Sequence, residues 1–489
     1  MTDSPQDRRW LALALLALSQ FVVVLDASIV NIALPSIGLD LNISENKLDW
    51  VVNAYVLVFG GFLLLGGRIA DLVGRRRVFM SGLVLFGLAS LVGGFSTSEG
   101  TLIAARAVQG LGGALLSPAA LSIITTTFRE GSERNKALGV WGAVAGGGGA
   151  AGVLLGGVLT DTLGWQWVFF VNTPITLAAA AFAPALIRES RADVARRHFD
   201  AFGALSVTAG LSLLVYAMVT ARDDGWGSSS TLGLFAAAAA LLMVFVLWER
   251  RSPAPLVPFR IFRIRNLTAA NIVGILLGAS LFSMFFFVSI YMQRVLGYSP
   301  LKAGFSYLPL AVTIILSAGI ASQLVTKLGF KRVLIFGLLC VTAGLLLFSQ
   351  IDAHGSFLAD VLPASLLAAL GLGFSFVPVT IASQAGVHGS EAGLASGLIT
   401  TSQQVGGALG LAILSTVAAS RTQDVIAAGH GSPAGALTEG FQSAFFVGAC
   451  FAIAGALLAL VLVRERELEE DAGIEPDDHT VEPDPVTSA

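Results

Sequence analysis

Residues 67–77, GRIADLVGRRR, and residues 322–332, SQLVTKLGFKR, each close an apolar run, and the two segments align with one another. Gly74 falls on Gly329, and two basic residues follow at the same distance in both segments. Two halves with corresponding loops are how many secondary transporters are built. The two segments therefore predict a chain made of two related halves.

The composition around these segments is that of an integral membrane protein. The 489 residues are 55% apolar and 12% charged, with a mean hydropathy of +0.79, whereas soluble proteins are about 25% charged. A membrane-spanning helix needs roughly 20 apolar residues. Apolar runs of about this length predict an all-α integral membrane protein with 14 transmembrane helices, near 10–35, 50–69, 78–96, 101–125, 137–160, 166–187, 201–220, 231–249, 268–291, 303–325, 333–350, 359–382, 393–418 and 441–463.

The spacing of the repeat predicts how these helices are grouped. The two aligned segments lie 255 residues apart, which exceeds a six-helix unit by about two helices. Charged stretches flank the seventh and eighth helices, so these two are the extra pair. We expect two pseudo-symmetric six-helix bundles at 1–199 and 256–464, two inserted central helices within 200–255, and a disordered acidic cytoplasmic tail at 465–489.

Lysine and arginine predict the orientation in the membrane. These residues stay on the cytoplasmic side in short loops, because their transfer across the bilayer is disfavoured. With the N-terminus inside, 23 of the 29 lie in cytoplasmic segments. An even number of helices places both termini on that side.

Several kinds of chemistry lack the residues they need. Cys340 and Cys450 both lie in apolar runs, none of the five histidines falls mid-span, and the chain has no GxxxxGK[ST] run for binding ATP phosphates. The spans contain no nucleophile–base pair and no metal-ligand cluster. We therefore expect no enzyme activity, cofactor, metal site or nucleic-acid partner, and the driving force should be an ion gradient or the substrate's own gradient.

Asp26 is the carboxylate placed deepest in a predicted span. A charged group at that depth costs several kcal/mol unless it is paired or hydrated. Helix geometry places Asp26 roughly 13 Å and Arg106 roughly 9 Å from the outer ends of their helices, so the two can meet. Burial disfavours the carboxylate and a guanidinium neighbour favours it, so a pair that breaks and re-forms can bind and release a proton. A carboxylate that only holds Arg106 in helix packing is the alternative.

Three polar sets are the candidates for the substrate pathway. On the fourth helix, polar and small residues recur along one face, which points to a cavity or to another helix. The thirteenth helix repeats the pattern, and the first carries two polar residues eleven apart. Hydrogen bonds that only pack helices are the alternative. The predicted pathway residues are Gln20, Asn31, Gln109, Ser117, Ser396, Thr400, Gln403 and Gln404.

Glycines in two segments predict local backbone geometry. In the segment 67–77, Gly74 permits a tight turn, and Asp71 and Arg75 are spaced to pair on the preceding turn. The second copy carries Thr326 in place of the acid. The fifth helix is rich in glycine, and its pairs at spacing four (142/146, 148/152 and 152/156) let helices approach closely or bend. The candidate motif residues in this helix are Gly142, Gly146, Gly149, Gly152, Gly156 and Gly157.

The sequence resembles the major facilitator superfamily, in its fourteen-span drug:proton antiporter branch (EmrB/QacA type). The resemblance covers nearly the whole chain and rests on LDASIVNIALP (25–35), GRIADLVGRRRVF (67–79), RAVQGLGGALLSPAAL (106–121), the glycine-rich stretch 139–157 and GWQWVFFVNTPI (164–175). It implies a two-bundle fold that rocks between inward and outward access and drives export with protons.

The resemblance also implies roles for individual residues. Arg106 and Gln109 would belong to the motif associated with proton transfer. Asp71, Gly74, Arg75 and Arg76 would form an inner gate latch that is closed while the site faces outward. The fifth-helix glycines would be the antiporter motif, which normally contains prolines, although here Gly149 and Val153 stand at the expected positions.

The expected function is export of amphipathic drugs, antibiotics or related organic compounds by proton antiport, from a bacterial inner membrane and by a monomer. The partners are then a small-molecule substrate, protons and the lipid bilayer. A narrow-specificity exporter of a metabolite or a self-made antibiotic shares all these features. A gradient-independent facilitator is the other alternative, and its transport would ignore collapse of the proton gradient.

Overall fold

A computed structural model describes residues 5–43, 48, 50–191, 200–253, 255–428 and 432–464. Within these ranges the chain is helical and contains no strand. Fourteen helices are long and apolar enough to cross a membrane, which confirms the predicted fold class. The predicted tail at 465–489 lies outside the described residues.

Within the described residues, the first half and the inserted pair contain nine helices. In the first half, α7 and α8 together form the sixth span, and α9 and α10 are the inserted pair. Their bounds are α1 Pro5–Asp40, α3 Trp50–Val73, α4 Arg75–Gly94, α5 Glu99–Thr127, α6 Ser132–Thr162, α7 Trp167–Phe170, α8 Asn172–Leu186, α9 Ala201–Asp224 and α10 Ser229–Glu249.

The second half contains longer helices with short irregular turns at their ends. Its elements are η1 Phe259–Arg263, α11 Arg265–Ile290, η2 Tyr291–Val295, α12 Pro300–Ser306, α13 Leu308–Leu328, α14 Phe330–Phe348, η3 Phe357–Val361, α15 Leu362–Gln384, η4 Gly389–Glu391, α16 Ala392–Ala427 and α17 Pro433–Leu462.

Two predicted spans are interrupted, and in each a proline explains the break. Proline has no N–H to donate to the carbonyl four residues earlier. Pro174 lies just after the junction of α7 and α8, and Pro309 lies just after the junction of α12 and α13. Most other helices extend a few residues beyond the predicted apolar runs, because a hydrogen-bonded helix continues into the polar residues that flank a span.

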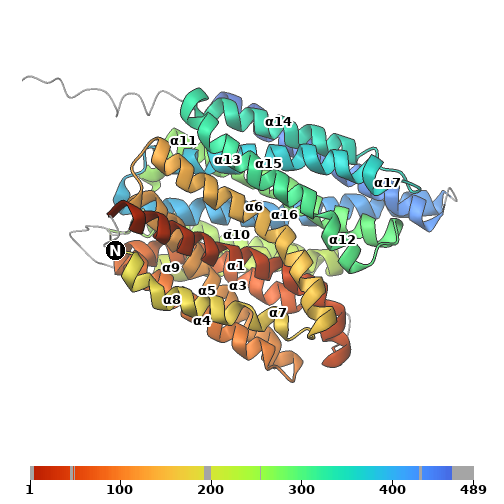
Figure 1. Ribbon diagram of the computed structural model, residues 1–489, viewed down its shortest axis with the longest axis horizontal. Helices are drawn as coiled ribbons and strands as arrows, with labels where there is room; N and C mark the ends of the chain where they lie inside the picture. The colour runs from red at the N-terminus through yellow and green to blue at the C-terminus, as the bar shows by residue number, and fades with distance from the viewer. Residues whose placement is uncertain are drawn as a thin grey trace, which may run out of the picture.

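Each half packs mainly on itself, and the two halves meet along a few helices (Figure 1). In the first half α5 packs against α3 and α4, and α1 packs against α6. In the second half α14 packs against α15, and α11 packs against α16. Between the halves α6 contacts α13 and α3 contacts α16, while α9 contacts both α3 and α16.

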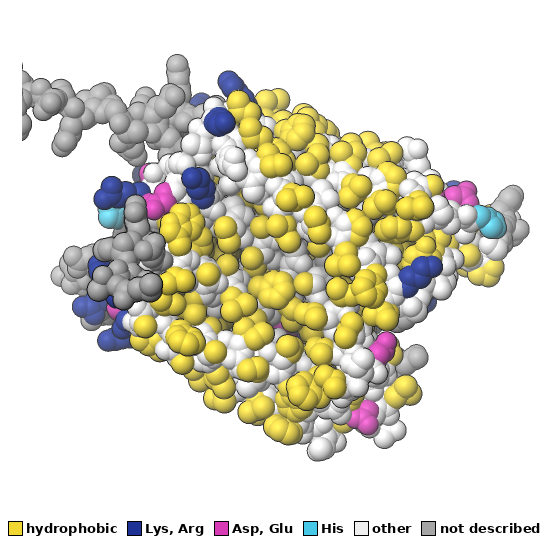
Figure 2. All heavy atoms as spheres, in the orientation of Figure 1, with side chains coloured by type: hydrophobic (Ala, Val, Ile, Leu, Met, Phe, Trp, Pro, Cys, Tyr) yellow, Lys and Arg dark blue, Asp and Glu magenta, His cyan; other side chains and the backbone are white. Residues whose placement is uncertain are grey.

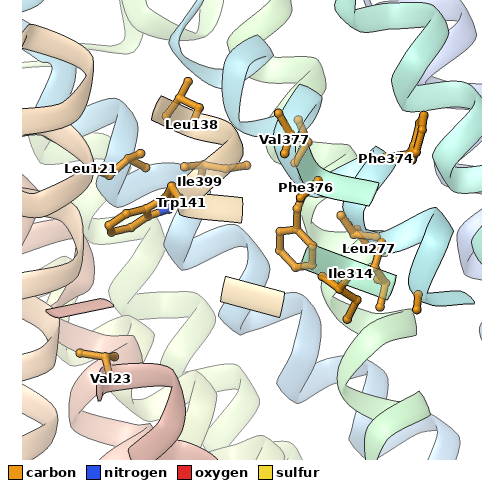
Figure 3. Close-up of a cluster of buried hydrophobic side chains, with 14 of the residues drawn as sticks. Val23, Leu121, Leu138, Trp141, Leu277, Ile314, Phe374, Phe376, Val377 and Ile399 are labelled. Atoms are coloured by element: carbon orange, nitrogen blue, oxygen red, sulfur yellow. The ribbon is translucent and has the colours of Figure 1, made fainter. Parts of the chain in front are cut away.

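A cluster of buried apolar side chains includes residues of both halves, and part of it is drawn in Figure 3. Its members are at most 9% exposed. The first half contributes Val23, Leu121, Leu138 and Trp141, and the second half contributes Leu277, Ile314, Phe374, Phe376, Val377 and Ile399. Here apolar contact holds the halves together.

The basic residues gather at one end of the molecule, where most of the visible lysine and arginine side chains lie (Figure 2). Arg9, near the start of α1, pairs with Glu133 at the start of α6 over 3.4 Å. The backbone N–H of Arg464, just after α17, donates to Asn266 at the start of α11 over 2.9 Å. In Figure 1, α6 and α11 both begin at the end of the molecule where α1 begins. The start of α1 and the end of α17 therefore lie at this same end.

Candidate functional site

Asp26 lies inside the first half and is completely buried. Its Oδ2 accepts a hydrogen bond from Arg106 Nη1 at 2.6 Å, so the contact expected from helix depth is present. Its Oδ1 accepts from Gln109 Nε2 and from Asn172 Nδ2, each at 2.8 Å. Three side-chain donors on α5 and α8 therefore compensate one buried negative charge on α1, which would otherwise be very costly to bury.

Arg106 is 1% exposed and has partners on all sides. Besides Asp26, its Nη1 donates to Gln109 Oε1 at 2.6 Å, and its Nε donates to the Val51 carbonyl at 2.9 Å. The guanidinium carbon lies 4.4 Å from the centre of the Tyr55 ring, within range of a cation–π interaction. The arginine thus links α1, α3 and α5.

Sequence reasoning did not name two members of this network, Ser90 on α4 and Asn172 on α8. Ser90 Oγ donates to the Phe169 carbonyl at 2.9 Å and accepts from Gln109 and Asn172 at 3.2 Å. Asn172 was recognisable, because it stands in the motif GWQWVFFVNTPI just before Pro174. Ser90 was not, because one hydroxyl in an apolar span carries no such signal.

The polar residues predicted on α1 and α5 are divided between interior and surface. Gln109 and Ser117 are each 1% exposed, and Gln109 bonds only to members of the buried network. In this conformation Gln109 therefore bonds inside the first half. Gln20 is 8% exposed, and its Oε1 has no hydrogen-bond partner among the described residues. Asn31 is exposed and donates to the Ala27 carbonyl of its own helix.

The predicted pathway residues on α16 lie in the second half, and no hydrogen bond in the described structure joins them to Asp26. Ser396 is fully buried and accepts from Gln384 Nε2 of α15 at 3.1 Å. Thr400 donates to the Ser396 carbonyl, and Gln403 and Gln404 are half-buried. The structure thus unites Asp26, Arg106 and Gln109 but leaves the predicted pathway residues of the second half apart from them.

Asp71 and Arg75 form a contact between the halves at the basic end of the molecule. Asp71 is completely buried and pairs with Arg75, whose Nη2 lies 2.6 Å from Oδ1. Its carboxylate also accepts the backbone N–H groups of Gly393 and Leu394, each at 3.0 Å. Arg75 Nη2 donates in turn to the Gly389 carbonyl at 2.6 Å. The carboxylate caps the first turn of α16, where a helix favours negative charge.

The turn before Arg75 requires glycine. Gly74 has a φ of 128°, a conformation that residues with a side chain rarely adopt. A Cβ there would also come within 2.7 Å of a carboxylate oxygen of Glu189. Arg76 completes the turn, because its backbone N–H donates to Glu189 and its Nη1 donates to the Ile187 carbonyl. The predicted pairing of Asp71 with Arg75 and the tight turn at Gly74 are both present.

The glycines of α6 lie on faces that touch different helices. A Cβ on Gly152 or Gly156 would come within 2.9 Å of a carbonyl oxygen of α1, whereas Gly149 has a looser contact with the same helix. Gly142 instead faces Val377 of α15, and Gly157 faces Leu301 of α12. Gly146 lies in the same helix. Without prolines, α6 is one continuous helix with α1 on one side and the second half on the other.

A cavity of about 460 Å³ lies beside the contact that Asp71 and Arg75 make with the second half. Both halves line it, with Arg75, Glu130 and Arg134 from the first and Gln384, His388 and Ser390 from the second. No group of three or more His, Cys, Asp or Glu side chains in the described ranges is placed to hold a metal ion.

These features define a membrane transporter of two related helical halves, and residues 16–411 match the Major Facilitator Superfamily. The chain belongs to this family. It is 41% identical to the puromycin resistance protein pur8 of Streptomyces alboniger, over 94% of this chain and 92% of the relative. It is 39% identical to the cephamycin export protein CmcT of Amycolatopsis lactamdurans, over 92% of each chain.

The fold is also that of solved members of the family. The structure of the proton:xylose symporter XylE superposes with a TM-score of 0.67 at 16% sequence identity, covering 96% of this chain and 99% of that one. This likeness extends to the fold alone.

Proposed function

We propose that the protein is a proton-coupled antiporter that exports amphipathic drugs, antibiotics or related organic compounds by alternating access. The observation that carries the proposal is the buried pair of Asp26 and Arg106, held at 2.6 Å inside a membrane-spanning bundle. A carboxylate is retained at that depth at considerable cost, and such groups mark ion pathways. Two relatives named for puromycin resistance and cephamycin export support antibiotics as substrates.

The network supports coupling because one carboxylate holds several helices together. Protonation of Asp26 removes the negative charge that faces Arg106 and weakens the bonds from Gln109 and Asn172. A buried guanidinium without its partner is strongly destabilising, so the helices α1, α5 and α8 should repack around the neutral acid. Proton binding is thereby linked to the shape of the first half.

The contact made by Asp71 supports alternating access. It joins α3 to the first turn of α16, so it holds the halves together at the basic end only while that end is closed. We infer that this contact is the inner gate latch and that Arg75 and Arg76 fix its geometry. Opening the basic end requires Asp71 to leave the N–H groups of α16.

The remaining expectations complete the proposal. The basic end faces the cytoplasm of a bacterial cell, with the protein in the inner membrane, both termini inside and a monomer as the working unit. The chain divides into bundles at 1–199 and 256–464 with the inserted pair at 200–255. Packing of α9 against both α3 and α16 supports a connecting role for the inserted pair.

The test is uptake of puromycin and of a cephamycin by inverted membrane vesicles with an imposed proton gradient. Asp26→Asn keeps the shape of the side chain and removes its charge, so gradient-driven uptake should fall by about 100-fold or more, the scale for loss of a positioned proton-transfer group. Asp40→Asn is the matched control, because Asp40 lies at the end of the same helix, exposed, and accepts from Trp165. Its uptake should match the wild type.

Each other outcome identifies an alternative. Undiminished gradient-driven uptake by the Asp26→Asn variant would refute the coupling role. If wild-type uptake is unchanged after the proton gradient is collapsed, the protein is a facilitator. Uptake of one compound from a wide panel would identify a narrow-specificity exporter instead of a multidrug pump.

A further inference from the structure

The segment 255–264, which joins the inserted helices to the second half, lies against the latch. It follows α10, contains the short helix η1 and runs into α11. Leu256, Val257 and Ile261 in this segment are at most 2% exposed. We call residues 255–264 the strap.

The end of α10 fixes the strap in place. Glu249, the last residue of α10, is 3% exposed, and its carboxylate accepts the backbone N–H groups of Leu256 and Val257, each at 3.1 Å. Two hydrogen bonds to one carboxylate set both the position and the direction of the backbone as it leaves the inserted pair. The inserted helices therefore determine where the strap lies.

The strap touches both sides of the latch. On the first half, Arg68 of α3 donates to the Pro255 carbonyl at 3.4 Å. On the second half, Arg260 Nη2 lies 2.9 Å from Glu391 Oε1. Glu391 directly precedes α16, whose first turn supplies the two N–H groups that Asp71 binds.

An apolar cluster adds to these polar contacts. It brings together side chains from the strap, from α3, from the inserted pair and from α16. Its members include Leu64, Val207, Phe245, Val257, Ile261 and Leu394. Burial of this kind depends on α3 and α16 lying close together, so the cluster is complete only with the basic end closed.

Opening this end must break one set of strap contacts, because α3 and α16 move apart while the strap stays joined to α10 and α11. The Arg260–Glu391 pair is the weakest, since the Arg260 side chain is 74% exposed and an exposed ion pair is easily replaced by water. We propose that the inserted helix pair is part of the inner gate: through the strap it positions the start of α16, and the Arg260–Glu391 pair is the contact that releases on opening.

This inference rests on the proposed alternating access, so the experiment reads the gate itself and not transport. Spin labels go on cysteines at Val73 and Lys327, exposed positions at the ends of α3 and α13, in a chain whose Cys340 and Cys450 are replaced by alanine. Pulsed electron paramagnetic resonance then measures the distance between the halves at the basic end. Asp71→Asn is the positive control and should populate longer distances.

Arg260→Glu and Glu391→Arg should each raise the long-distance population by roughly fivefold, because each reversal replaces an attraction by a repulsion. The double variant Arg260→Glu with Glu391→Arg restores the attraction and should return the distribution to that of the wild type. Arg263→Glu is the matched control, because Arg263 is exposed, lies on the same short helix and has no hydrogen bond or ion pair among the described residues. It should leave the distances unchanged.

The outcomes separate the two proposals. If Asp71→Asn lengthens the distance and neither single reversal does, the strap has no part in the gate while alternating access stands. Failure of the double variant to restore the distance would equally overturn the ion pair as the releasing contact. If Asp71→Asn has no effect either, the latch itself fails, and the strap with it.

Discussion

The two halves share a fold but differ in how they hold their buried polar groups. Within the described residues, the first half contains both ion pairs whose two side chains are at most 4% exposed, Asp26 with Arg106 and Asp71 with Arg75. The second half uses neutral groups in comparable places. Asn271 of α11, which is 7% exposed, accepts from Ser402 of α16 at 2.8 Å.

The aligned segments show the same difference at the basic end. Asp71 on α3 binds two backbone N–H groups at the start of α16. Its counterpart Thr326 on α13 accepts from the Asn135 side chain near the start of α6 at 3.0 Å. A charged cap responds strongly to protons and to separation, whereas a hydroxyl–amide bond does not. We propose that the charged half supplies the parts that change state during transport and that the neutral half supplies their counterpart.

The helices that carry these contacts also meet differently. Between α6 and α13, close contacts recur from Gly139 with Ser322 to Gly147 with Ile315. Between α3 and α16, close backbone contact is found near Gly67, one turn before Asp71. The first pair of helices is therefore in close contact over a longer stretch than the second pair.

The largest effect should come from breaking the buried ion pair. Arg106→Ala leaves Asp26 without its cation and should lower the free energy of unfolding by about 3–5 kcal/mol. Asn271→Ala, the neutral comparison in the second half, should cost about 1–3 kcal/mol, since it leaves only a hydroxyl unpaired. Denaturation of both purified variants in the same detergent measures the difference. Equal decreases in the free energy of unfolding would show that the buried Asp26–Arg106 ion pair contributes no more to stability than the neutral pair of Asn271 and Ser402.

A smaller effect should follow from making the halves more alike. Thr326→Asp places a carboxylate beside Asn135 in the first turn of α6, where a helix N-terminus favours negative charge by about 0.3–1 kcal/mol. This reproduces the Asp71 arrangement at the second site, so the closed basic end should be more populated and export should slow by roughly twofold to fivefold. Initial rates of puromycin uptake by inverted vesicles measure this.

Thr326→Asn is the control for that variant, because it changes shape similarly and adds no charge. It should export at close to the wild-type rate. If Thr326→Asn slows export as much as Thr326→Asp, the effect is steric, and the asymmetry between the latches has no electrostatic basis.

The sequence predicted the spans and their order because long apolar runs can only be buried in lipid or protein. It also predicted that Asp26 and Arg106 could meet, since rise per residue places both at similar depth. It did not predict that Gln109 would bond inside the first half, because a polar stripe on one helix does not reveal which neighbour it faces. Ser90 and the strap were beyond reach, since both depend on contacts between distant segments.

The smallest effect should come from two tyrosines, one in each half. Tyr55 lies against Arg106 at 2% exposure, and its hydroxyl has no hydrogen-bond partner among the described residues. Tyr307 in the second half is 3% exposed and donates to the Phe285 carbonyl at 2.9 Å. Tyr55→Phe keeps the ring beside the guanidinium and removes an unsatisfied hydroxyl, whereas Tyr307→Phe removes a hydrogen bond that is present in the wild type.

We therefore expect Tyr55→Phe to leave the free energy of unfolding within about 0.5 kcal/mol of the wild type, and Tyr307→Phe to lower it by about 1 kcal/mol. Denaturation of both variants under one condition provides the measurement. Uptake by the Tyr55→Phe variant should stay within roughly twofold of the wild type, because either ring can face the cation. A large loss for Tyr55→Phe would mean that its hydroxyl bonds to a group of the charged network in another conformation of the transport cycle, which would add Tyr55 to the parts of the first half that change state.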